Sequence, residues 1–339
     1  MLLTCLFTVL TMEPTFQITL DLGGVPGEDV SLNRVILAAD GSLLGLSPYR
    51  VWHWDSEGRL IRCFGHKGEG PGEFLYVSEA LWDGEHYWVI DGSRQASSIF
   101  DAEGNYLFQQ GLYFRQLLRV GSQLFSLDHS QLRFDPVTYP PVLQPIQYTI
   151  QDRKLNVSKT GPPFKKVSVK QMEYSFNFKL LWVARDGDRY LVVDQLEPKM
   201  RIYSPETIER ENSVPLDQTF SPDFIPIQVT RWVNAPKELP RQPQNYTAMK
   251  KWMHSFSKIN YFGPLGIEKE YVVAYLIPDP EDNLSSRQII QTVDGNGKIL
   301  GPLFEGAGMI VGSRDRQVLV YNETDTVDDI KHVLEIYQF

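Results

Sequence analysis

Two aspartates have the clearest potential for chemistry in this sequence. Asp91 and Asp194 each end an apolar run of the same kind, Val-Ile-Asp and Val-Val-Asp. Carboxylates at matching positions of a repeated structure could line a calcium site, because calcium takes several oxygen ligands. The alternative, which we favour, is that each carboxylate accepts hydrogen bonds from the backbone of its own loop. We therefore predict no metal site and no cofactor, with calcium left open.

The histidines and serines show no catalytic spacing. The six histidines form no HxH or HExxH pattern, and no serine stands in a G-x-S-x-G setting. His66 and His129 fall in expected loops, whereas His53 and His86 fall inside expected strands, where histidines more often pack than bind a ligand. The sequence therefore leaves any catalytic residue unknown, and we favour a protein that is not an enzyme.

A glycine-rich segment, Gly-His-Lys-Gly-Glu-Gly-Pro-Gly-Glu-Phe, runs from Gly65 to Phe74. A phosphate-binding loop needs a strand before it, a helix after it and a Lys-Ser/Thr pair. Here Pro71 and Phe74 lead into another apolar run instead. The segment therefore predicts a structural junction between two sheets and not a nucleotide site.

The aspartates, histidines and glycine-rich segment lie within a series of repeated β-hairpins. An alternating strand, a D-x-x-G turn and a second apolar strand recur, because Asp opens the turn with its side chain and Gly takes the left-handed position. Asp-Gly pairs between apolar runs predict a second hairpin in each unit. The D-x-x-G turns begin at Asp55, Asp101 and Asp294, and the Asp-Gly pairs lie at 40–41, 83–84 and 186–187. Two hairpins in each unit of 40 to 50 residues are typical of a β-propeller blade.

The spacing of Asp55 and Asp101, 46 residues, sets the period. When about 15 leader residues and an insertion of about 48 residues are set aside, the rest of the 339-residue chain holds about six such units. We predict an all-β fold, a six-bladed β-propeller of four-stranded antiparallel blades, as a single domain over 15–339. An insertion is expected at 215–262. The blades are expected near 32–66, 77–111, 116–160, 179–214, 267–305 and 307–339. The strand 15–21 is expected to complete the last blade and so protect its edge.

One helix is expected within the insertion, near 244–258. Asn245 can cap its N-terminus, and apolar side chains then recur on one face at helical spacing. These side chains are Tyr246, Met249, Trp252, Met253 and Phe256. We favour a helix that lies on the propeller over one that binds a partner or a membrane surface.

The N-terminus and the net charge indicate the compartment. Residues 1–14 are expected to be a signal or leader remnant, because their apolar run resembles the core of a secretory signal and is too short to span a bilayer. Cys5 is a candidate acceptor for a lipid anchor, and Cys63 is the only other cysteine, which excludes a disulfide framework. The net charge of −9 argues against nucleic-acid binding. We expect an exported protein of the periplasm or outer membrane without a transmembrane span, and a cytosolic protein as the alternative.

One segment resembles a known family. The run F-G-x-x-G-x-G-P-G-x-F from Phe64 to Phe74 resembles the blade junction of NHL-repeat and TolB-like six-bladed propellers. The Val-Ile-Asp that ends at Asp91 and the turn at 101–104 match the rest of such a repeat. Many relatives are uncharacterised envelope proteins of Gram-negative bacteria, often lipoproteins. The resemblance implies a fold and a compartment but no reaction.

We therefore expect a recognition propeller of the bacterial envelope that binds a peptide, glycan or protein. The alternative is a calcium-dependent propeller hydrolase or lyase acting on a sugar or lactone. Loops after the second and fourth strands of each blade share one side of the disc, and that side receives the longest loops, where binding residues concentrate. Cations and aromatics, the types that anchor interfaces, occur there. The candidate ligand-binding residues are His66, Tyr76, Arg94, Arg115, His129, Arg231, Trp232 and Tyr261.

Overall fold

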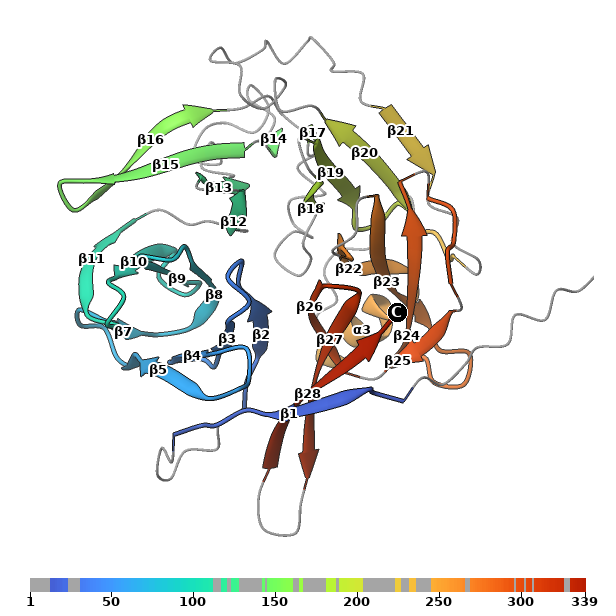
Figure 1. The fold of residues 1–339 in the computed structure, drawn as a ribbon, viewed down its shortest axis with the longest axis horizontal. Coiled ribbons are helices and arrows are strands. Elements are labelled where there is room, and N and C mark those ends of the chain that lie inside the picture. Colours follow the sequence, from blue (N-terminus) through green and yellow to red (C-terminus); the bar gives the residue numbers. More distant parts are fainter. Residues whose placement is uncertain are drawn as a thin grey trace, which may run out of the picture.

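Four-stranded antiparallel sheets make up most of the described chain in the computed structural model (Figure 1). Within the described residues six sheets have four strands and two have two strands. The structure describes residues 13–23, 31–111, 117–120, 123–127, 142–143, 145–160, 165–166, 181–186, 189–203, 223–226, 232–235, 245–265, 269–295, 297–301, 303–306, 308–325 and 330–339.

The first three sheets follow one another along the chain. Sheet 1 contains β2 (Arg34–Leu37), β3 (Leu43–Leu46), β4 (Val51–Trp54) and β5 (Leu60–Phe64). Sheet 2 contains β8 (Val77–Trp82), β9 (Tyr87–Asp91), β10 (Ala96–Phe100) and β11 (Tyr106–Gln110). Sheet 3 contains β12 (Leu117–Val120), β13 (Gln123–Leu127), β15 (Pro145–Gln151) and β16 (Lys154–Thr160).

Three more sheets complete the order. Sheet 4 contains β18 (Leu181–Asp186), β19 (Arg189–Asp194), β20 (Lys199–Tyr203) and β21 (Asp223–Pro226). Sheet 5 contains β22 (Lys258–Pro264), β23 (Glu270–Pro278), β24 (Ser286–Asp294) and β25 (Phe304–Gly306). Sheet 6 contains β26 (Met309–Arg314), β27 (Gln317–Asp325), β28 (Ile330–Gln338) and β1 (Phe16–Thr19). The small sheets pair β6 (His66–Lys67) with β7 (Glu73–Phe74), and β14 (Val142–Leu143) with β17 (Lys165–Lys166).

The sheets form a propeller-like ring. Figure 1 shows them around a common centre in chain order, so that sheet 6 in red returns beside sheet 1 in blue. The first strands of neighbouring sheets contact each other at β8 and β12, β18 and β22, β22 and β26, and β26 and β2. This is the arrangement in which each sheet buries both faces against its neighbours.

The predicted turns are confirmed where the structure describes them. The Asp55 carboxylate accepts hydrogen bonds from the backbone N–H groups of Glu57 and Arg59, and Gly58 takes the left-handed conformation at φ 81°. The equivalent turn at 101–104 repeats both features. Local turn chemistry therefore fixes where these strands end.

The N-terminal strand completes sheet 6, as expected. β1 pairs with β28 in antiparallel register, with Phe16 opposite Ile336. Its buried Ile18 joins the apolar core between sheets 6 and 1, together with Trp52 and Leu334. Residues distant in sequence therefore close the ring between its first and last sheets.

The boundaries of the insertion differ from the prediction. Strand β21 and strand β22 both lie within 215–262, the range that the sequence assigned to the insertion. β21 lacks alternation and ends in Pro226, which an edge strand tolerates because it does not need that N–H group. Gly263 and Pro264 at the end of β22 likewise weaken the strand pattern in the sequence. The segment between the two sheets is consequently shorter than expected.

The predicted helix is confirmed in a shorter form, as α3 (Tyr246–Met253). The Asn245 side chain caps it by accepting a hydrogen bond from the backbone N–H of Ala248, 2.8 Å away. Phe256, just beyond the helix, is buried, whereas Lys250 and Lys251 are exposed. No helix among the described residues is long and apolar enough to cross a membrane.

Candidate functional site

The junction between sheets 1 and 2, residues 65–76, is the best-defined loop of the predicted binding side. It begins after β5, and its strands β6 and β7 pair in parallel before the chain enters β8. Phe74 is fully buried beneath it. Gly65 has a φ of 87°, and a Cβ there would lie 2.6 Å from the Phe74 ring. Glycine is needed at position 65 because the backbone is left-handed there and because a side chain would collide with Phe74.

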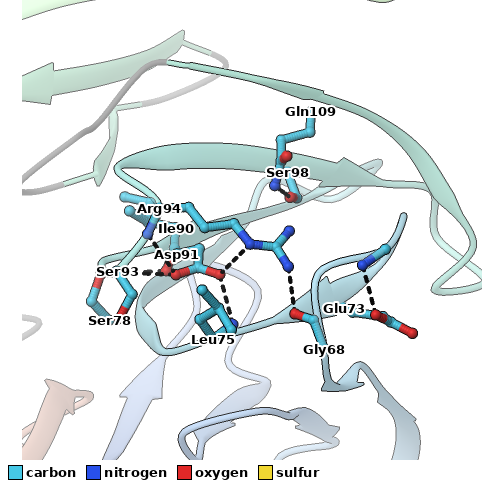
Figure 2. Close-up of polar contacts among 11 residues, drawn as sticks. Gly68, Glu73, Leu75, Ser78, Ile90, Asp91, Ser93, Arg94, Ser98 and Gln109 are labelled. Carbon is cyan, nitrogen blue, oxygen red and sulfur yellow. Dashed lines mark hydrogen bonds and ion pairs between the residues drawn. The ribbon is translucent and has the colours of Figure 1, made fainter.

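The Asp91 carboxylate ties this junction to the loop that follows β9 (Figure 2). Its Oδ2 accepts a hydrogen bond from the Leu75 N–H at 2.8 Å. Its Oδ1 accepts from the N–H groups of Ser93 and Arg94 at 3.0 and 3.1 Å. Asp91 is fully buried, so the carboxylate exchanges water for these backbone donors. The favoured prediction, that Asp91 caps its own loop, is confirmed.

The Arg94 side chain also contacts the junction, through Asp91 and the Gly68 backbone. Its Nε lies 3.5 Å from Asp91 Oδ2, and its terminal nitrogen donates a hydrogen bond to the Gly68 carbonyl oxygen (Figure 2). Only 15% of the side chain is exposed. Arg94 was expected to bind a ligand directly, and its contacts describe a residue that positions the junction.

Glu73 holds the tip of the junction. Its Oε2 accepts a hydrogen bond from the Gly70 N–H at 2.6 Å, and its Oε1 lies 2.9 Å from His66 Nε2. The Gly70 hydrogen bond keeps the pKa of Glu73 below its ordinary value, and His66 adds to this effect. Gly68 leaves room for the carboxylate, because a Cβ there would lie 2.0 Å from Glu73 Oε2.

Six residues of the junction are exposed: His66, Lys67, Glu69, Pro71, Leu75 and Tyr76. We call four of them, His66, Lys67, Leu75 and Tyr76, the junction surface. Leu75 is 37% and Tyr76 43% exposed, so two large side chains face solvent next to the buried Phe74. The Lys67 ammonium lies 5.3 Å from the centre of the Tyr49 ring, within cation–π range. The sequence reasoning missed Lys67 and Leu75, although their place beside His66 and Tyr76 was a usable signal.

Trp232 and Tyr261 do not belong to this surface. Trp232 is half-buried and packs against the core that includes Tyr275, with ring centroids 6.4 Å apart. The Tyr261 hydroxyl lies 2.9 Å from Ser313 Oγ and so links sheets 5 and 6, and burial raises its pKa to about 12. The remaining three candidates, Arg115, His129 and Arg231, lie outside the described residues.

The second aspartate of the calcium hypothesis also caps its own loop. Asp194 Oδ1 accepts a hydrogen bond from the Leu196 N–H at 3.0 Å. Over the ranges that the structure describes, no three His, Cys, Asp or Glu side chains are grouped as metal ligands would be. The absence of a metal and of a cofactor, with calcium left open, stays a prediction.

The fold is similar to that of solved Bacteroides proteins. No protein-family model matches the chain, and no curated protein sequence matches it. A DUF4221 family member from Bacteroides vulgatus has 9% identity and a TM-score of 0.55 over 98% of both chains. A protein from Bacteroides fragilis, provisionally named an exported protein, has 12% identity and a TM-score of 0.52 over 96% of this chain and 94% of that one. The β-propeller domain of Cps50 (Swd1) from Myceliophteria thermophila has 12% identity over 96% of this chain and 99% of that one, and its TM-score of 0.43 is too low to argue from. At these identities the similarity shows the fold alone.

Proposed function

We propose that the chain is a six-bladed propeller, of the NHL-repeat and TolB-like kind, that binds a partner through its junction surface. One observation carries this proposal. Asp91 and Arg94 fix the backbone of the junction, while His66, Leu75 and Tyr76 stay exposed. A rigid backbone that presents an aromatic, an aliphatic and an imidazole side chain loses little conformational entropy when it binds.

The proposed partner is a peptide, glycan or protein, and the proposed compartment is the bacterial envelope. Tyr76 can stack on a sugar ring or pack against an apolar side chain. Because His66 Nε2 faces the Glu73 carboxylate, Nδ1 is the ring nitrogen that remains for a hydrogen bond with a sugar or a peptide. The apolar start of the sequence supports export, with Cys5 as the proposed lipid acceptor. The provisional name of the Bacteroides fragilis protein agrees with this compartment.

A screen followed by matched variants tests the proposal. The purified chain would be applied to a printed glycan array and a displayed peptide library, and hits would be measured by calorimetry. Tyr76→Ala should weaken the best hit by about 2 kcal/mol, roughly 30-fold, as for an interface anchor. Arg59→Ala and Lys298→Ala, in exposed turns on the predicted opposite side, should change nothing. Equal losses from both sets, or no hit in either screen, would contradict the proposal.

The hydrolase or lyase alternative makes a different prediction. Among the described residues the structure offers no metal-ligand group, so no observation favours this alternative over binding. Turnover of a sugar lactone that chelation abolishes would replace the binding proposal with the enzymatic one.

A further inference from the structure

A buried polar cluster lies between sheets 1 and 2, away from the junction surface. His53 of β4 and Tyr87 of β9 are 4% and 1% exposed, and His53 Nδ1 lies 2.6 Å from the Tyr87 hydroxyl oxygen. Trp82 packs against Tyr87 with ring centroids 4.4 Å apart, and its Nε1 donates to Asp40 Oδ2 at 2.9 Å. The buried His53–Tyr87 hydrogen bond and the exposed Trp82–Asp40 hydrogen bond thus join the two sheets.

These contacts fix the position of the His53 proton. Arg62 of β5 also hydrogen-bonds to the Tyr87 hydroxyl, and a guanidinium can only donate. The hydroxyl oxygen therefore accepts from Arg62, and the single proton of the hydroxyl goes to His53 Nδ1. Burial raises the pKa of Tyr87 to about 12, so the hydroxyl keeps that proton. The neutral His53 ring consequently carries its own proton on Nε2.

Two buried donors of this cluster lack a protein acceptor. His53 Nε2 and Arg62 Nε are both inaccessible to solvent and make no hydrogen bond in the described part of the protein. His53 and Arg62 are directly opposite each other on β4 and β5, so their side chains leave the sheet on the same face. Buried N–H groups in native proteins nearly always find an acceptor.

The charges of the cluster decide what kind of acceptor fits. Asp40 acts on His53, Asp101 acts on Arg62, and Glu103 acts on Tyr87. Three carboxylates and a single guanidinium therefore act on this cluster, which disfavours an additional anion. A neutral oxygen acceptor therefore fits the two donors, and a water molecule can supply one among buried polar groups.

We infer that one water molecule is enclosed between sheets 1 and 2 and accepts hydrogen bonds from His53 Nε2 and Arg62 Nε. Such a water links Arg62 of β5, the strand that leads into the junction, to His53 of the neighbouring strand β4. It is a structural component of the seam between the two sheets, independent of whether the junction surface binds a partner.

A high-resolution crystal structure of the full chain tests this inference. We expect one density peak at about 2.7–3.2 Å from both nitrogens. A crystal soaked in bromide should show no anomalous peak there. The absence of a peak near both nitrogens would overturn the inference, and a bromide peak would replace the water with an anion site.

Histidine-selective ¹⁵N NMR supplies a test that does not need crystals. Near neutral pH we expect His53 as the Nε2–H tautomer, with a cross-peak from Hε2 to a long-lived water. Arg62→Met should weaken or abolish this cross-peak, whereas Arg59→Met, an exposed control, should leave it unchanged. An Nδ1–H tautomer, or a cross-peak that Arg62→Met does not alter, would contradict the proposed site.

Discussion

The Asp91 carboxylate and the Arg94 guanidinium lie 3.5 Å apart, and each also reaches a backbone group of the junction between sheets 1 and 2. The pair belongs to the loop after β9, whereas the bonded groups belong to the segment that precedes β8. The shape of the junction is therefore set by a neighbouring loop and not by its own sequence alone.

Replacing Asp91 with Asn should destabilise the protein. The amide keeps one acceptor oxygen where the carboxylate has two, so at least one buried backbone N–H loses its partner, at a cost of about 1–3 kcal/mol. Urea denaturation would measure this loss. Asp101→Asn removes similar hydrogen bonds in a solvent-exposed turn and should cost less. A smaller effect at Asp91 than at Asp101 would show that the junction does not depend on this carboxylate.

Gly65→Ala should also destabilise the fold. Alanine is strained at a φ of 87°, and its methyl group would approach both the Phe74 ring and the Tyr49 carbonyl oxygen, so we expect a loss of about 1–3 kcal/mol. Gly111→Ala is the matched control, because among the described residues no atom beyond its chain neighbours lies within 4 Å of its Cβ position. Equal midpoints of denaturation for the two variants would contradict this account of the junction.

Acid should weaken the seam between sheets 1 and 2 through His53. Burial lowers the pKa of His53 below its ordinary 6.5, opposed by Asp40 and reinforced by Arg62. The unfolded chain then binds this proton at higher pH than the folded chain does, so the stabilisation is complete above pH 6.5 and is lost as the pH falls through the folded pKa.

The variant His53→Gln cannot titrate and should flatten the dependence of unfolding free energy on pH between about 5 and 7. Burial lowers the pKa of His254 in the same direction, so His254→Gln should remove a separate part of the slope. If His53→Gln keeps the whole wild-type slope, the acid sensitivity arises elsewhere.

Chelation should leave the melting temperature unchanged if the protein is only a binder. A metal bound by the native state alone stabilises it by about 2.7 kcal/mol at a hundredfold excess over Kd, and removing the metal would lower the melting temperature visibly. Calorimetry with and without a calcium chelator makes the comparison. A marked drop would support the enzymatic alternative.

Much of the fold was predictable, because local chemistry determines where strands turn. The turns at Asp55 and Asp101 carry both their caps and their left-handed glycines in the sequence itself. The pairing of β1 with β28 was predicted from the lack of a fourth strand in the last sheet. β21 was not predictable, since four residues ending in Pro226 leave no periodic signal.

The candidate site was only partly predictable. The glycine pattern locates the junction, and His66 and Tyr76 follow from it. The role of Arg94 depends on contacts with Asp91 and Gly68 that no local pattern encodes. The prediction for Tyr261 was wrong for a different reason. The sequence suggested an exposed aromatic side chain near a loop, whereas its hydroxyl group is hydrogen-bonded to Ser313 between sheets 5 and 6.

Hydrogen–deuterium exchange with the best hit from the glycan or peptide screen tests the central claim most directly. If the junction surface binds, residues 65–76 should exchange more slowly in the complex, while the turns at 55–59 and 101–105 keep their rates. Protection of those turns with unchanged exchange in the junction would contradict the account.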